Sequence, residues 1–328
     1  MAREIFLDVL DVDAVILPRI VALGDIDEDE LAFAQAASPS AETLDLPPAL
    51  DGLARRLALA RLIEAWAKQL KPGDPAQAPL VLGGPASTLA LADDLARLMD
   101  DMTTRGVDWR ALDGLAPDAL DVYWQLTLDF LKIARDYWPA YLKETGRIEP
   151  AMRRDRLIEA EAARLATHHA GPVIAAGSTG SMPSTAKLLH AIAKLPNGAV
   201  VLPGLDTDLD EDAWRLIGGI RDEISRAFTS PPAAGHPQFA LHGLLKRFGL
   251  SRTEVATLGV PASHGREMLT SEAMRPADAT AQWHTRLAEP DVAGKIAGGM
   301  QNLAVIAAAN PEMEALAIAA AMREAREL

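Results

Sequence analysis

Two apolar runs joined by a glycine-rich turn and a helical pattern constrain the fold of this sequence most. The stretch Gly171–Asp206 opens with Val173-Ile174-Ala175-Ala176, continues through a turn and a helical run over Ser184–Lys194, and ends in the apolar run Ala199–Leu202. Neither run alternates with polar residues, which is typical of strands buried on both faces of a parallel sheet. The sequence therefore predicts a βαβ unit and an α/β fold.

The turn, Gly177-Ser178-Thr179-Gly180-Ser181, lies at the carboxyl end of the first strand, where open α/β sheets bind ligands. It is not a Walker-type phosphate loop, because the first lysine, Lys187, lies one turn inside the helix. It also lacks the third glycine of a dinucleotide fingerprint. Two interpretations stay open. The turn is either a tight connection, with Ser181 or Ser184 capping the helix and Pro183 in its first turn, or a loop that contacts a ligand.

Composition narrows the functional classes. The 328 residues include 46 acids and 32 Lys and Arg, so the formal net charge is -14, and nucleic acid should be repelled unless basic residues gather on one face. The absence of cysteine excludes disulfides, thiol catalysis and cysteine-ligated metal from this chain. There is no run of 18 apolar residues, and the first twenty residues are too charged for a signal peptide. A cytoplasmic location without membrane insertion is therefore expected.

Changes in composition predict four regions. A run rich in Ser, Pro and small residues over Ser38–Pro48 marks the first boundary. The chain opens in a helical pattern without a cap and closes within another, which indicates a piece of a longer protein. The regions are 1–49, the first part of an α/β core with a strand over 14–17; 50–168, a helical insertion; 169–300, the rest of the core; and 301–328, the start of a second α/β unit.

Apolar residues recur at helical spacing throughout the predicted insertion. The third helix carries an aromatic seam that includes Tyr123, Trp124, Tyr137 and Trp138. Aromatic side chains can stack on the bases of single-stranded nucleic acid. At helical spacing we interpret them as core residues, with base stacking as the alternative. The helices are expected over 50–70, 87–103, 117–145 and 150–168.

Beyond the βαβ unit, the pattern predicts a helix over Trp214–Ala227 and another over Phe239–Phe248. An irregular connection is expected over 260–290, with a helix at 277–287. A strand over Leu303–Ala307 and a helix over 312–328 should then form the second βα unit. His236 and His242 are six residues apart, which is the wrong spacing for two ligands on one helical face, so no metal site is expected there.

Charged clusters have both a functional and a plain interpretation. Arg147, Arg153, Arg154 and Arg156 form the densest basic cluster, which is either a solvated helix start flanked by acids or a contact for phosphate. The acid-rich stretch 25–30 would suit a hard cation, but acids also accumulate where a loop enters a helix. The stretch 206–212 is acid-rich as well, but no base, nucleophile or histidine lies near it in the sequence, so no catalytic pair is predicted there.

Five motifs follow one another along the chain: Leu17-Pro18-Arg19-Ile20 with Leu23–Glu28, Gly177–Pro183, Val201–Asp206, His236-Pro237-Gln238, and Asn310-Pro311-Glu312 with Glu314-Ala315. In this order they resemble the amino-terminal region of the AddB family, the double-strand break repair subunits of bacterial AddAB helicase–nucleases, in its alphaproteobacterial branch. The resemblance extends over essentially the whole chain.

The resemblance implies a parallel-sheet, helicase-like core of the P-loop NTPase class, interrupted by an all-helical insertion. The turn Gly177–Ser181 would stand where active motors carry a Gly-Asp-x-x-Gln segment, and its lack of Asp and Gln argues against coupling to ATP. The family's Walker loop, where present, would precede this chain, and its iron–sulfur nuclease domain would follow it. No catalytic residue, cofactor or metal is therefore expected here.

The implied function is a non-catalytic scaffold that binds the AddA helicase–nuclease subunit and duplex or single-stranded DNA ends during recombinational repair. The residues expected to contact phosphate are Ser178, Thr179, Ser181, Arg153, Arg154, Arg156 and Lys187. The alternative is an α/β enzyme or nucleotide-binding protein that uses the turn for a small phosphorylated ligand. Magnesium-dependent ATP binding with turnover would favour that alternative.

Overall fold

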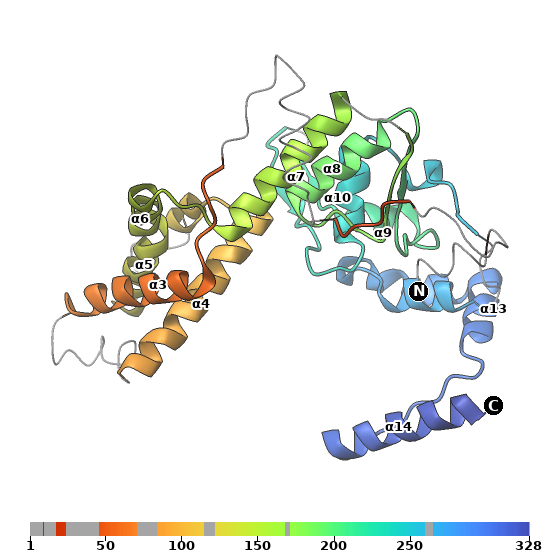
Figure 1. Cartoon of the computed structure of the whole chain (residues 1–328). Helices are drawn as coiled ribbons and strands as arrows, with labels where there is room; N and C mark the ends of the chain where they lie inside the picture. Colours follow the sequence, from red (N-terminus) through yellow and green to blue (C-terminus); the bar gives the residue numbers. More distant parts are fainter. Residues whose placement is uncertain are drawn as a thin grey trace. The chain divides into compact units, whose positions relative to one another are not determined.

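The computed structural model describes residue 9 and residues 18–23, 46–70, 84–114, 122–167, 171–222, 224–259 and 265–327. This part of the chain is mostly helical, with two small two-stranded sheets, and it divides into two compact units, Met1–Pro203 and Gly204–Leu328 (Figure 1). The division at Pro203 falls inside the predicted region 169–300. The four predicted regions stay predictions. In the described residues, no helix is both long and apolar enough to cross a membrane.

In the first unit, four helices surround an apolar core. They are α3 (Gly52–Ala67), α4 (Pro85–Arg105), α5 (Val122–Lys132) and α6 (Trp138–Thr145), and α3 lies beside α4 (Figure 1). Leu59, Ile63, Leu95 and Ile133 are almost completely buried. The helix α3 begins after Asp51, whose carboxylate accepts hydrogen bonds from two backbone N–H groups of the first turn. The described parts of the predicted helices are therefore confirmed.

A π-helical turn, Ile133–Tyr137, joins α5 to α6. It has a wider turn than the α-helix on either side. Trp138 directly after it is buried and stacks on Tyr141 at 5.2 Å between ring centroids, which confirms the core interpretation for this residue. Tyr137 is 58% exposed, so the same interpretation is wrong there. The side chains of Tyr123 and Trp124 lie outside the described part of the structure.

A buried ion pair ties α3 to the residue before α7 (Pro150–Thr167). The guanidinium of Arg55 lies 3.0 Å from the carboxylate of Glu149 and also binds Asp100 at 2.9 Å. The indole N–H of Trp138 donates to the same Glu149 carboxylate. Burial raises the pKa of Glu149, and the nearby Arg55 charge and the Trp138 hydrogen bond only partly offset this.

The predicted βαβ unit is present. It comprises β1 (Val173–Ala176), α8 (Pro183–Ala193) and β2 (Gly198–Val201), and the strands pair in parallel with Val173 opposite Gly198 and Ala176 opposite Val201. Helix α8 packs on both strands and α7 packs against α8. These bounds agree with the predicted strands and helix to within one or two residues.

The prediction that both faces of this sheet are buried is wrong. Ala175 is buried, but the neighbouring Ile174 is 68% exposed, so one face of β1 lacks a cover among the described residues. An apolar run shows that a face can be buried, but it does not show how many layers cover it. The described part contains one parallel pair of strands rather than the larger parallel sheet of a helicase-like core. The predicted strand over 14–17 and the acidic stretch 25–30 lie outside the described residues.

The second unit is built from short elements. Helix α10 (Phe239–Phe248) confirms the prediction, and α14 (Pro311–Glu327) confirms the last helix. The 277–287 helix is present as a 3₁₀ turn, η5 (Ala277–Gln282), followed by α12 (Trp283–Leu287). The remaining elements are α9 (Glu211–Ile217), the antiparallel pair β3 (Ile220–Arg221) and β4 (Phe228–Ser230), the 3₁₀ turn η4 (Arg252–Glu254), α11 (Arg266–Ala273) and α13 (Pro290–Gly299).

Two predictions for this unit are wrong. The helix expected over Trp214–Ala227 ends at Ile217, because Gly218 and Gly219 follow, and Gly219 has a φ of 77° that most side chains avoid. The strand expected over Leu303–Ala307 is an exposed coil, with Val305 96% exposed. This segment has no neighbouring strand in the described residues to pair with. Its apolar composition alone does not make it a strand.

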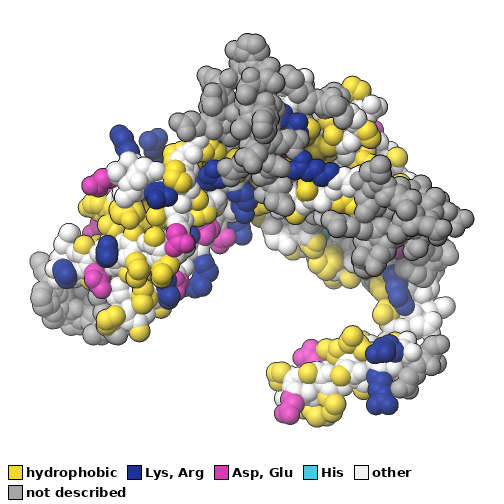
Figure 2. All heavy atoms as spheres, viewed as in Figure 1, with side chains coloured by type: hydrophobic (Ala, Val, Ile, Leu, Met, Phe, Trp, Pro, Cys, Tyr) yellow, Lys and Arg dark blue, Asp and Glu magenta, His cyan; other side chains and the backbone are white. Residues whose placement is uncertain are grey.

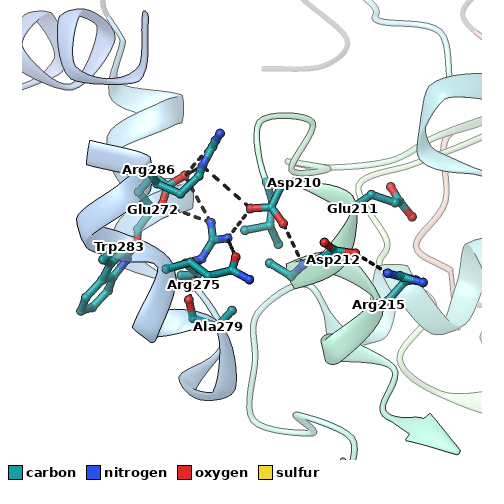
Figure 3. A network of polar contacts seen from close by, with 12 residues as sticks. Asp210, Glu211, Asp212, Arg215, Glu272, Arg275, Ala279, Trp283 and Arg286 are labelled. Carbon is teal, nitrogen blue, oxygen red and sulfur yellow. Dashed lines mark hydrogen bonds and ion pairs between the residues drawn. The ribbon is translucent and has the colours of Figure 1, made fainter. Parts of the chain in front are cut away.

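A buried polar network joins α9, α11 and α12 (Figure 3). The side chain of Arg275 is fully buried. It donates to the carboxylates of Asp210 and Glu272 and to the side-chain oxygen of Gln282. Arg286 binds Glu272 at 3.1 Å. Burial by itself would raise the pKa of Asp210, but hydrogen bonds from the backbone N–H of Ala213 and from Arg275 outweigh it and lower the pKa.

The contact between α11 and α13 requires glycine at residue 265. Gly265 has a φ of 76°, and a Cβ placed there would lie 2.0 Å from the backbone oxygen of Lys295. We expect Gly265→Ala to lower the free energy of unfolding of the second unit by about 1–3 kcal/mol, through overpacking and backbone strain. Hydrogen–deuterium exchange of α11 and α13 in increasing urea would measure the loss.

Gly294→Ala is the matched control for this change. Gly294 lies within α13, and nothing lies within 4 Å of a Cβ placed there. Alanine should stabilise this helix by about 0.5–1 kcal/mol, because glycine loses more backbone freedom on folding. Equal effects of the two substitutions would show that the α11–α13 contact does not depend on Gly265.

Candidate functional site

The turn after β1 leads directly into α8. Gly177 and Gly180 both have positive φ, 80° and 63°, which allows the chain to reverse over a few residues. The N–H of Gly177 donates to the backbone oxygen of Val201 at 3.2 Å, and the N–H of Gly180 donates to the Ser178 hydroxyl oxygen at 3.2 Å. The turn is therefore fixed to the carboxyl end of the parallel pair.

Helix α8 begins without a side-chain cap. Its N-cap residue is Met182, and Pro183 occupies the first turn, as predicted. The expected serine cap is wrong, because the hydroxyl of Ser184 donates instead to the carboxylate of Asp155 on α7 at 2.9 Å. The first backbone hydrogen bond of the helix runs from Ala186 to Met182. The N–H groups of Ser184 and Thr185 are therefore without a partner among the described residues, as four N–H groups are at an uncapped helix start.

Two of the basic residues predicted to contact phosphate, Arg154 and Lys187, lie where α7 packs against α8. The guanidinium of Arg154 lies 3.8 Å from the Met182 sulfur at the start of α8, and 3.9 Å from the Asp155 carboxylate. One turn further along α8, Lys187 forms an ion pair with Glu159 of α7. The structure thus brings Arg154 close to the uncapped helix start, while an acid accompanies each of these two cations.

The other residues that were predicted to contact phosphate do not gather at one place. Arg153 donates to the backbone oxygen of Pro47 at 3.2 Å, which directs it toward the segment before α3. Arg156 is exposed on α7. In the turn, Ser178 and Thr179 are half-buried and Ser181 is exposed. The structure therefore places Arg154, Lys187 and the turn along one helix pair, and the role of all seven residues in binding stays a prediction.

Three residues of this site do not stand out in the sequence. Asp155 looks like one flanking acid among several, but it accepts the hydrogen bond that the Ser184 hydroxyl donates in the first turn of α8. Thr185 is buried, and its hydroxyl has no hydrogen-bond partner within the described part of the chain. Met182 takes the N-cap position that serine usually occupies. The only sequence signal was Pro183, which marks the first turn but does not identify its partners.

The charge distribution on the first unit is mixed. Over its helices, in the face that Figure 2 shows, Lys and Arg side chains alternate with Asp and Glu and with apolar atoms. Two exposed cations pair with an acid one turn away, Arg97 with Asp94 and Lys132 with Asp129. This pattern differs from a continuous basic groove. Any contact with nucleic acid therefore needs local geometry as well as charge.

Compared with known proteins, the chain matches no family model, and no curated protein or solved structure matches it. The resemblance seen in its motifs therefore stays a prediction.

Proposed function

We propose that this chain is a non-catalytic, helicase-like scaffold of an AddAB-type helicase–nuclease that acts in double-strand break repair. In this proposal, the start of α8 and the adjoining α7 contact the phosphates of a DNA end, and another face binds the AddA subunit. The proposal combines the resemblance of the motifs with the parallel β1–α8–β2 unit. The described residues form a mostly helical protein with one parallel pair of strands.

The uncapped start of α8 is the observation that carries the proposed phosphate contact. Free N–H groups and the helix dipole make such a terminus attractive to anions. The hydroxyl groups of the turn and the guanidinium of Arg154 lie at the same end of the helix. The turn carries no lysine, carboxylate or histidine that could assist hydrolysis. This chemistry suits the holding of a phosphate group better than its transfer.

A salt titration tests this contact. We expect the double variant Arg154→Ala/Arg156→Ala, in the complex with AddA, to weaken binding of a blunt DNA end equally for all sequences. For duplex DNA, each lost phosphate contact should reduce the slope of log K against log salt by about 0.9. Fluorescence anisotropy from about 50 to 200 mM salt would measure this slope. Arg97→Ala is the control, because Arg97 is an exposed, acid-paired arginine on α4.

Three outcomes would contradict the proposed scaffold function. The first is equal slopes for the double variant and the Arg97 control. The second is failure of the chain to associate with AddA. The third is tight, magnesium-dependent ATP binding with turnover by this chain, measured by calorimetry and phosphate release, which would favour the nucleotide-binding alternative. The uncapped start of α8 leaves that alternative open, since a nucleotide phosphate can occupy the same type of position.

A further inference from the structure

A pocket of about 280 Å³ opens in the first unit between α5 and the 3₁₀ turn η2 (Trp109–Gly114). Half of its described lining residues are apolar and half are polar, and the half-buried indole of Trp109 is the largest side chain among them. The volume lies just below the range of roughly 300–1,000 Å³ that is usual for small-molecule sites, so one ring system fits better than an extended ligand. The lining residues are Trp109, Leu112, Leu128 and Leu131, with Gln125, Asp129, Lys132 and Arg135 as the polar ones.

Each of the two cations in the pocket lining is paired with an acid. Lys132 forms an ion pair with Asp129, one turn earlier on the same helix. Arg135 binds the carboxylate of Asp136 through two hydrogen bonds of 2.8 and 2.9 Å, and this arginine lowers the pKa of Asp136. Both cations therefore already have a carboxylate partner. A polyanion would have to compete with these acids, whereas an uncharged guest would not.

The wall formed by α5 is held in place from behind. On its other face, Leu126, Phe130 and Ile133 are buried in the core of the helical bundle. Directly after the π-helical turn, Trp138 is buried as well and donates to Glu149. A wall anchored in this way exists before any guest binds, so little ordering cost arises on binding. π-helical turns of this kind are frequent at functional sites.

We propose that this pocket receives a large apolar side chain, with an aromatic ring as the preferred guest, from a partner protein. Four apolar lining side chains with acid-paired cations beside them match the usual arrangement of a protein-binding hot spot, in which one anchor enters a desolvated pocket and the polar rim excludes water. The neutral rim favours a protein side chain over a nucleotide with its phosphate. This inference uses residues other than those of the proposed DNA contact and does not rest on it.

Fluorine NMR of the whole chain labelled with 5-fluorotryptophan tests the pocket. The sequence contains six tryptophans, and the signal of Trp109 is the one that is missing from the Trp109→Phe variant. The probe is N-acetylphenylalaninamide, which presents an uncharged aromatic side chain. We expect it to shift the Trp109 signal in a saturable way and to leave the signals of the buried Trp138 and of Trp214 unchanged.

Leu128→Phe should fill the pocket and weaken probe binding by about tenfold or more, which corresponds to 1.4 kcal/mol. Leu57→Phe makes the same chemical change at an exposed position of α3, away from the pocket lining, and should leave binding unchanged. An unshifted Trp138 signal shows that each variant is folded. Three results would overturn the proposal: no shift of Trp109 with the probe, equal binding by the two leucine variants, or a shift of Trp109 by a thymidine oligonucleotide in place of the probe.

Discussion

Arg55→Met is expected to lower the free energy of unfolding of the first unit by about 3–5 kcal/mol, the usual cost of removing one partner of a buried ion pair. Glu149 would then remain buried, with the Trp138 indole as its main hydrogen-bond partner. Burial already raises its pKa even with Arg55 in place, so the carboxylate depends strongly on this arginine. Hydrogen exchange of α3 and α7 in increasing urea would give the value for this unit alone.

Two further variants separate this explanation from a general effect of losing an arginine. Arg56→Met removes the neighbouring arginine, whose pair with Asp93 is partly exposed, and should cost no more than about 1 kcal/mol. The double variant Arg55→Met/Glu149→Gln removes the buried charge as well and should regain most of the lost stability. A double variant as unstable as the single one would show that Arg55 acts through packing instead of charge.

Arg275→Met is expected to have an effect of similar size in the second unit, about 3–5 kcal/mol, because Arg275 is fully buried and two carboxylates depend on it. Arg286 would still compensate Glu272, whereas Asp210 would keep the hydrogen bond from the Ala213 N–H but, among the cations of the described residues, only the more distant Arg286, 3.9 Å away. Arg215→Met is the control in the same helix as the Asp210 cap. Its pair with Asp212 is exposed, and its loss should cost no more than about 1 kcal/mol (Figure 3).

Arg275→Met should also change how the free energy of unfolding responds to acid. The pKa of Asp210 is lower in the folded state than its usual value near 3.8, so its contribution is fully present above about pH 4 and is lost as the pH falls through the folded pKa. Without Arg275 the pKa should return toward its usual value, and this part of the acid dependence should flatten. A profile of urea midpoints between about pH 2 and 6 would show the change. An unaltered profile would contradict the role given to Arg275.

The local rules of helix formation made part of this fold predictable. Helix α10 ends at Phe248 because Gly249 follows with a φ of 71°, and the preceding His236-Pro237 blocks an earlier start. The βαβ unit was predictable because its two apolar runs flank a turn that contains two glycines. Such signals lie within a few residues of the element that they determine.

Other features depend on contacts between distant segments. Helix α11 packs on α13 where Gly265 meets Lys295, and neither residue marks a helix by itself. At the candidate site, the helix cap was mispredicted because Asp155, 29 residues before Ser184, takes its hydroxyl. The pocket beside Trp109 was missed for the same reason, since η2 and α5 each look ordinary alone. A pattern along the chain cannot show which partner is near.

The π-helical turn at Ile133–Tyr137 also determines how α6 is rotated about its axis relative to α5. Its extra residue lets Ile133 and Trp138 both point inward while Arg135 remains beside the pocket. Deletion of a single residue there would restore a regular helix with better hydrogen bonds, yet would rotate α6 by about 100° relative to α5. Trp138 would then turn away from Glu149. A locally more regular chain would thus be a less stable protein, and this stretch should tolerate substitutions far better than changes in length.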